Sequence, residues 1–275
     1  MKTIFLKVRT FLPAGGPVHY REVAVKKFKP TVDQLIPNLT PAEEIVLLAR
    51  ALWAEGYRDH LAGHITYNLG DGTMLCNPWL LTWEEILPAD IIRIDVDGNV
   101  VQGDWPVPLG IPLHLALHRA RPDVGIALHN HSEFGTVWAD LGEVPPAYDQ
   151  SSSLGGGEVV LVDEYDGGVD NMEAAEAAIR SIGPADRALL AGHGVFVTGS
   201  TAAAVYLRAV ALEQRCKNAW MIRVAGGPEK TALPDWWLDR MAGSDGNSYH
   251  GFWEAAVRAA LRSDPELAES LQASQ

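Results

Sequence analysis

The chain has 275 residues, 47% of them apolar and 21% charged, so it can bury a full core and is not a disordered protein. Its formal net charge of −13, without any dense lysine or arginine run, argues against nucleic acid and anionic membranes as partners. The only two cysteines, Cys76 and Cys216, form no Cys-x-x-Cys motif, which excludes a thiolate zinc site and a disulfide framework. We find no export signal and no apolar stretch of membrane-spanning length, so we expect a cytoplasmic protein.

The predicted elements begin after an N-terminal arm. Residues 1–38 contain many prolines and glycines, which predicts an extended arm rather than a long helix or strand. A helix then starts at Thr40, which can cap it, with Pro41 in the first turn and Glu43 completing a capping box. Apolar residues three and four positions apart continue this helix to about Gly56.

Short β-rich runs follow, and then strands alternate with helices. The runs between Gly63 and Val101 are separated by turn signals, including a hairpin at Asp97-Gly98, and predict a meandering antiparallel sheet. We expect a main domain of residues 39–225 and a Trp-rich extension, residues 226–275, that packs on this domain or on a neighbouring subunit. Helices are predicted at 112–120, 132–141, 171–182 and 201–221, and strands at 124–128, 155–162, 188–190 and 195–197.

Three histidines form the candidate metal site. His129 and His131 are two positions apart at a predicted strand end, so both imidazoles project from one face and can reach the same ion. His193 lies between Gly192 and Gly194, which leave the backbone free to adopt turn conformations. Three neutral imidazoles suit Zn²⁺, Fe²⁺, Mn²⁺ or Co²⁺, with positions left for substrate or water. A His-x-His pair alone is a weak signal in a chain with nine histidines.

Three passages match a known family in order and in spacing: residues 113–124, 129–132 and 190–195. Together they resemble the class II aldolase and adducin head-domain family, and the resemblance extends from about Leu39 to about Trp220. Residues 61–66, 77–86 and 97–101 are similar to the adducin-like branch. The resemblance implies an α/β fold, a three-layer α/β/α sandwich on a mainly antiparallel central sheet, and commonly a homotetramer. It also makes His129, His131 and His193 metal ligands.

One residue that the resemblance implies is absent. The sugar-phosphate aldolases of the family have a glutamate nineteen residues before the first ligand histidine, where it binds metal and moves the substrate proton; this chain has Gly110. A glycine can do neither. The family's phosphate-binding loop is not plainly present between Val107 and Pro112 either, so we do not assume a phosphorylated substrate.

Other side chains are candidates for the missing catalytic role. His114, at the start of a predicted helix, offers a group that titrates near neutral pH, or else is a hydrogen-bonded structural histidine. His64 occupies a loop that lines the pocket in the resembled family, where it can bind a substrate anion or only hold the backbone. Tyr148 and Tyr165 can supply a phenolic proton, and Glu133 can orient a ligand imidazole.

The leading hypothesis for function is a divalent-metal-dependent lyase acting on a small carbonyl or carboxylate compound, with no organic cofactor. It would cleave a carbon–carbon bond next to a carbonyl, by retro-aldol reaction or decarboxylation, through a metal-stabilised enediolate. Decarboxylation needs no base before the bond breaks, so it tolerates a glycine at position 110 better. Zinc is the expected metal, with iron, manganese or cobalt as alternatives. Two other hypotheses are a non-haem iron, O₂-dependent oxygenase acting on an aromatic 2-keto or 2-hydroxy acid, and a non-catalytic adducin-like head domain.

Overall fold

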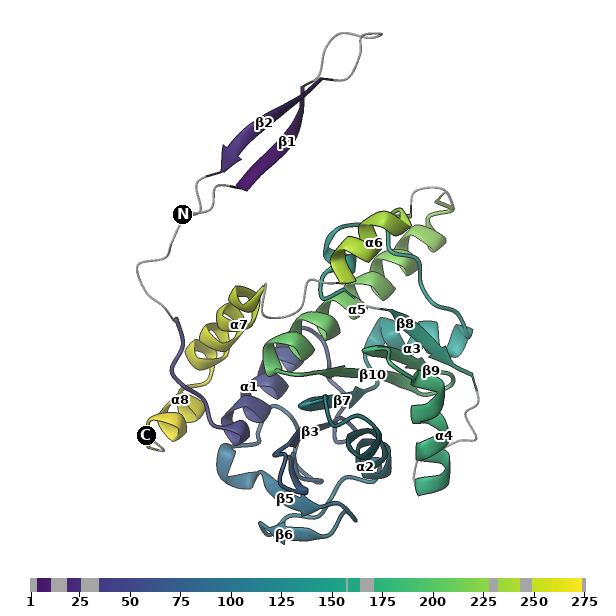
Figure 1. Cartoon of the computed structure of the whole chain (residues 1–275). Helices are drawn as coiled ribbons and strands as arrows, with labels where there is room; N and C mark the ends of the chain where they lie inside the picture. The colour runs from purple at the N-terminus through teal and green to yellow at the C-terminus, as the bar shows by residue number, and fades with distance from the viewer. Residues whose placement is uncertain are drawn as a thin grey trace. The chain divides into compact units, whose positions relative to one another are not determined.

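The computed structural model describes residues 4–10, 19–25, 35–156, 158–163, 171–227, 232–242 and 249–273. The chain divides into two units, Met1–Pro37 and Asn38–Gln275. In the first, strands β1 (Ile4–Thr10) and β2 (His19–Val25) pair antiparallel, with Ile4 opposite Val25 (Figure 1). The extended arm predicted for this segment therefore contains a hairpin, because the prolines and glycines that argued against a long element lie outside its two strands.

The second unit is built on one mixed sheet of eight strands. Neighbouring strands run antiparallel except for the parallel pair β8–β9, as the sequence predicted for most of the sheet. In spatial order the strands are β6 (Val100–Gln102), β5 (Ile92–Asp95), β4 (Thr73–Cys76), β3 (His64–Asn68), β7 (Ile126–Asn130), β10 (Gly194–Gly199), β9 (Arg187–Leu190) and β8 (Val159–Val162).

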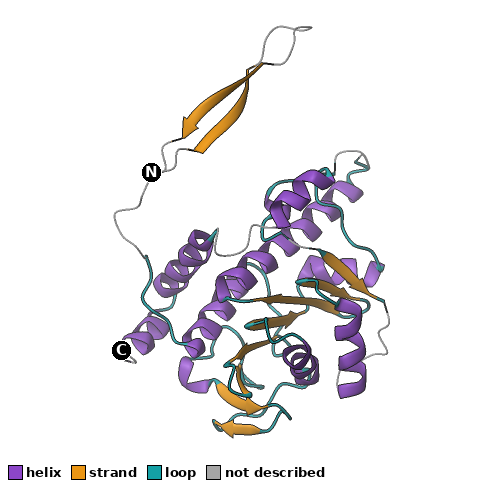
Figure 2. Ribbon diagram, in the orientation of Figure 1, coloured by secondary structure: helices purple, strands orange, loops and turns teal. Residues whose placement is uncertain are grey.

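Helices cover both faces of this sheet (Figure 2). Helices α2 and α4 pack together on one face, and α5 packs with α1 and α3 on the other. The helices are α1 (Pro41–Ala54), α2 (Ile111–Ala120), α3 (Glu133–Leu141), α4 (Met172–Ile182), α5 (Ala202–Val224), α6 (Asp235–Ala242), α7 (His250–Ser263) and α8 (Pro265–Ala273), and the five predicted from sequence lie close to their expected ranges. Within the described residues, no helix combines the length and the apolar composition needed to cross a membrane.

The alternation of side chains along the strands decides which residues face which helices. Ala127 of β7 and Phe196 of β10 belong to a buried cluster with Leu117 of α2 and Ile179 of α4. Their neighbours in sequence, such as Leu128, are equally buried but point to the opposite face. His129, two residues after Ala127, therefore projects toward the side of the sheet that α2 covers.

The predicted capping box of α1 is confirmed. The Thr40 hydroxyl accepts a hydrogen bond from the Glu43 amide at 3.3 Å, and the Glu43 carboxylate accepts one from the Thr40 amide at 2.7 Å. Both interactions satisfy amide groups that the first turn of a helix otherwise leaves without partners. The buried face of α1 then packs against α5 and β3.

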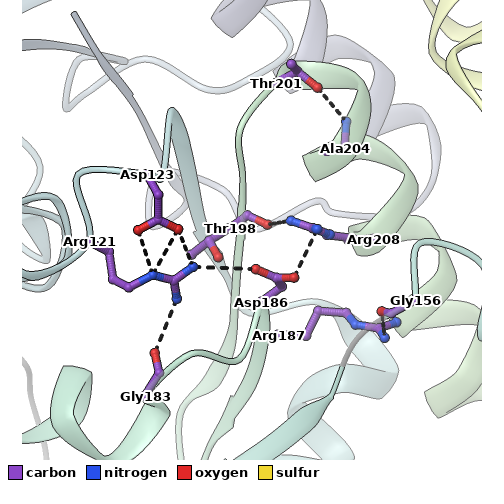
Figure 3. A network of polar contacts seen from close by, with 10 residues as sticks. All are labelled: Arg121, Asp123, Gly156, Gly183, Asp186, Arg187, Thr198, Thr201, Ala204 and Arg208. Carbon is purple, nitrogen blue, oxygen red and sulfur yellow. Dashed lines mark hydrogen bonds and ion pairs between the residues drawn. The ribbon is translucent and has the colours of Figure 1, made fainter. Parts of the chain in front are cut away.

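Ion pairs tie the strands together at the end away from the candidate site (Figure 3). Asp186, directly before β9, lies 2.9 Å from the Arg208 guanidinium of α5 and 3.8 Å from that of Arg121. Arg121 is held by Asp123 at 2.8 Å, and Arg208 also donates to the Thr198 carbonyl of β10 at 2.5 Å. This network joins the loop before β7 to β9, β10 and α5, so it fixes the relative positions of the strands.

The C-terminal helices contact the main domain. Trp253 of α7 is buried, and its ring lies 5.9 Å from that of Tyr206 on α5. Asp264, between α7 and α8, pairs at 2.9 Å with Arg50 of α1, which also donates to the Ile86 carbonyl at 3.0 Å. The boundary between the main domain and the C-terminal extension, expected at residue 225, stays a prediction. A contact of this extension with a neighbouring subunit also stays a prediction.

We expect Thr40→Ala to lower the free energy of unfolding by about 1 kcal/mol, because the mutant loses the side-chain oxygen of the helix cap. Urea denaturation followed by circular dichroism measures the change. Thr40→Ser is the matched control, since it keeps a hydroxyl in the same place. An equal loss of stability in both variants would contradict the role given to the cap.

Candidate metal centre

Two adjacent strands bring the three histidines together. His129 lies in β7 and His131 follows it, whereas His193 occupies the turn between β9 and β10. Because β10 pairs antiparallel with β7, with Phe196 opposite His129, this turn lies beside the end of β7. A β-carbon on Gly194 would lie 2.6 Å from the Asn130 carbonyl oxygen, so only glycine permits this approach. Gly192 has a φ of 65°, so it adopts the kind of turn conformation that the sequence argument expected of the glycines beside His193.

The distances between the imidazoles suit a single bound ion. The Nε2 atoms of His129 and His131 are 3.3 Å apart, and those of His193 and His129 are 2.9 Å apart. The three ligand atoms all lie within 4.8 Å of one another. Zinc–nitrogen bonds of about 2.0–2.1 Å place ligand nitrogens roughly 3.3 Å apart at tetrahedral angles and roughly 2.9 Å apart at right angles. These two distances fit a divalent ion held by the three imidazoles.

The second nitrogen of two of these rings is held by a hydrogen-bond acceptor. His129 Nδ1 lies 2.9 Å from the Val195 carbonyl, which can only accept, so Nδ1 carries the proton and Nε2 the lone pair. His131 Nδ1 lies 2.8 Å from the Asp59 carboxylate, which also accepts from the His131 amide at 3.0 Å. Such partners orient ligand histidines and raise their basicity. Sequence reasoning missed Asp59 and suggested Glu133, which is exposed at the start of α3.

Burial keeps the imidazoles of His129 and His193 in the neutral form that binds metal. The pKa of His129 is lowered well below its ordinary value, first by burial and then by His64, His193 and His131. The pKa of His193 is lowered to about 4, mainly by burial and by His131, with Asp59 acting in the opposite direction. At neutral pH both rings are therefore unprotonated at one nitrogen, because desolvation disfavours the charged form.

The two histidines predicted to be catalytic lie at different depths beside this cluster. His64 starts β3 opposite His129, and the two ring centroids are 4.9 Å apart. His114 lies behind it on α2, with its Nε2 at 3.4 Å from His64 Nδ1. His64 keeps 5% of its surface exposed and His114 keeps none, so of these two only His64 can touch a substrate. Their catalytic roles stay predictions.

The tyrosines named as candidates are not among these histidines. Tyr148 is half-buried and lies near Arg223, in the C-terminal part of α5. The pKa of Arg223 is raised mainly by its hydrogen bond to Glu143, and Tyr148 adds to this rise. No hydrogen bond or ring contact joins Tyr148 to His129, His131 or His193 in the part of the chain that the structure describes. Tyr165 lies outside the described residues. A role for Tyr148 stays a prediction.

Comparisons with known proteins agree with this fold. The model of the Class II Aldolase and Adducin N-terminal domain matches residues 43–220. A 5-methylthioribulose-1-phosphate/5-deoxyribulose-1-phosphate aldolase of Rhodospirillum rubrum is 30% identical over 185 residues, which cover 66% of this chain and 80% of that protein. A 5-deoxy-D-ribulose 1-phosphate aldolase of Bacillus thuringiensis serovar kurstaki is 24% identical over 201 residues, 73% of this chain and 92% of that one.

The solved structure of L-fuculose 1-phosphate aldolase from Glaciozyma antarctica PI12 has a TM-score of 0.71 at 20% identity, covering 84% of this chain and 96% of that one. This likeness confirms the predicted α/β fold class. The similar proteins carry the names of sugar-phosphate aldolases, so the adducin-like branch stays a prediction. Because the family model matches more than half of its length, this chain belongs to the class II aldolase and adducin family.

Proposed function

We propose that this protein is a divalent-metal-dependent lyase that cleaves a carbon–carbon bond next to a carbonyl group of a small molecule. One observation carries the proposal: the Nε2 atoms of His129, His131 and His193 converge, and acceptors hold the second nitrogen of the first two rings. When bound, a divalent ion supplies Lewis-acid stabilisation of the negative charge that develops on the carbonyl oxygen. Zinc is the expected ion, with iron, manganese or cobalt as alternatives.

His64 is the side chain that we assign to the substrate beside this centre. A β-carbon on Gly110 would lie 2.2 Å from His64 Cε1 and 2.7 Å from Nε2. The imidazole thus fills the space beside position 110, where the sugar-phosphate aldolases that the sequence resembles carry a glutamate. His64 is therefore the neighbouring group able to exchange a hydrogen bond with a substrate hydroxyl. His114 acts behind it, since it is fully buried.

The names of the similar aldolases make ketose 1-phosphates the first compounds to test. The substrate class that we propose is wider: a carbonyl compound with a neighbouring hydroxyl or carboxylate, cleaved by retro-aldol reaction or decarboxylation. The homotetramer and the cytoplasmic location expected from the sequence are part of the same proposal.

His193→Ala should abolish stoichiometric metal binding, because two imidazoles in place of three leave the ion with too few protein ligands. Metal content is measured by mass spectrometry after anaerobic purification, and turnover is screened on ketose 1-phosphates, hydroxy-aldehydes and 2-keto acids with and without O₂. His60→Asn, at an exposed histidine outside the cluster, is the control. Retention of ion and turnover by His193→Ala would refute the proposal, and iron with O₂ consumption would replace the lyase by an oxygenase.

Asp59→Asn should weaken metal affinity by about 10- to 100-fold, because the neutral amide is a poorer partner for His131 Nδ1 than the carboxylate is. Competition for zinc with a chromophoric chelator measures the change. Glu133→Gln is the matched control and should bind zinc as the wild type does, since Glu133 is exposed. Equal effects of the two substitutions would show that Asp59 does not support the ion.

Gly110→Ala should lower turnover by about 100-fold with metal content unchanged, because the new methyl group displaces His64. The backbone at Gly110 has φ −80° and ψ 10°, which alanine adopts without strain, so the effect reports the ring alone. Gly251→Ala is the control, because a β-carbon there meets no other atom within 4 Å. Undiminished turnover in Gly110→Ala would remove His64 from the reaction.

A further inference from the structure

A buried chain of polar side chains extends behind His64, away from the three candidate ligands. His64 Nδ1 lies 3.4 Å from His114 Nε2, the longest contact of the chain. The Thr66 hydroxyl then lies 2.8 Å from His114 Nδ1 and 2.8 Å from His118 Nε2. Thr66 and His118 are both buried, and the proposed function gives neither of them a role. Four polar side chains are thus joined in a place where water cannot replace a lost partner.

The periodicities of a strand and of a helix bring these four side chains together. His64 and Thr66 are two residues apart on β3, so both project from the face of the sheet that α2 covers. His114 and His118 are four residues apart on α2, so they lie one above the other on the same side of that helix. The ring of His114 also packs edge-on against Phe196 at 5.3 Å, which fixes the depth at which it meets Thr66.

Burial keeps the three imidazoles of this hydrogen-bonded series neutral. It lowers the pKa of His64 and of His114 well below the ordinary value, and the neighbouring histidines lower both further. Burial also lowers the pKa of His118, to about 4. A neutral imidazole donates from one nitrogen and accepts at the other, so the proton position on one ring determines the proton position on the next.

Two arrangements of hydrogens satisfy all three contacts and also use the Thr66 hydrogen. Thr66 has one hydrogen and two lone pairs, so it cannot donate to both imidazoles, and accepting from both would leave its own hydrogen without an acceptor among these side chains. If Thr66 donates to His118, then His114 donates its Nδ1 hydrogen to Thr66 and accepts at Nε2 from His64 Nδ1. If Thr66 donates to His114, every bond reverses, and the hydrogen of His64 moves to Nε2.

His118, at the far end of this hydrogen-bonded series, favours the first arrangement. His118 Nδ1 is fully buried, and the only group that raises the pKa of this ring is the backbone of Val124. A backbone group raises the pKa of an imidazole by accepting from it, and His118 Nε2 already faces Thr66, so we place the proton of His118 on Nδ1 although no full hydrogen bond forms there. With Nδ1 protonated, His118 Nε2 must accept from Thr66, and the other bonds follow.

We propose that His118, Thr66 and His114 are positioning residues that hold His64 as its Nδ1–H tautomer, so that His64 Nε2 presents a lone pair. This atom faces Gly110, next to the ring of His129. A lone pair accepts a hydrogen bond from a hydroxyl and repels a carboxylate. The chain thereby selects hydroxy-carbonyl substrates over keto acids. The inference deepens the proposed lyase function and rests on it for the substrate, but the tautomer exists without turnover.

The tautomer can be read in the full-length ¹⁵N-labelled protein by long-range ¹⁵N–¹H correlation of the imidazole signals, without added metal and with zinc. His64→Asn assigns the signals of the ring. We expect Nδ1 of His64 to be protonated and Nε2 to be bare in the wild type. A protonated Nε2 in the metal-free wild type would overturn the inference on its own, whether or not any variant folds.

Thr66→Val tests the chain, because valine keeps the shape of threonine but removes the hydroxyl. The His64 ring should then lose its single tautomer, and kcat/KM for a hydroxy-carbonyl substrate should fall about tenfold with metal content unchanged. Thr66→Ser should restore both. An unchanged His64 tautomer in Thr66→Val overturns the inference. The expected tautomers without any lyase turnover would instead refute the proposed function and leave the positioning chain intact.

Discussion

The antiparallel pairing of β7 with β10 is the constraint on which the candidate site depends. Its register places Phe196 opposite His129, and Phe196 is buried in the core beneath α2 and α4. A slip of one residue would turn Phe196 away from that core, so burial of apolar surface fixes the register strongly. The same register brings the turn that holds His193 beside His131 and the Val195 carbonyl to His129 Nδ1. The register that buries Phe196 in the core therefore also determines where the imidazoles lie.

The sequence predicted the features that depend on neighbours along the chain. The capping box of Thr40 and Glu43, the Asp97-Gly98 hairpin and the pairing of His129 with His131 all rest on spacings of a few residues. Such spacings translate directly into helical or strand periodicity. His193 could be added because its flanking glycines let the backbone adopt turn conformations, and the family resemblance joined it to the other two.

The parts that the sequence could not predict depend on contacts between distant segments. Asp59 supports His131 from the loop after α1, and no spacing relates the two residues. Glu133 was the plausible candidate because it follows His131 closely, yet it points to solvent from the start of α3. The different depths of His64 and His114 could not be predicted either, because they depend on how α2 packs over β3. Periodicity predicts which face of a helix or strand a residue lies on, whereas the packing of one element against another determines how deeply its side chain is buried.

A glycine in place of a glutamate at position 110 changes the charge of the site as well as its shape. The His64 ring and any side chain at position 110 would claim the same space, so a glutamate there and this ring position exclude each other. With a glutamate, one negative charge would offset a divalent ion; among the described residues, Asp59 behind His131 is the carboxylate that would do so here. Under the proposed lyase function, the positive charge left on a bound ion would be available to the substrate oxygen, whose negative charge would grow as the bond breaks. A neutral ligand set would then favour the transition state more than the ground state of an uncharged carbonyl, which is the condition for catalysis.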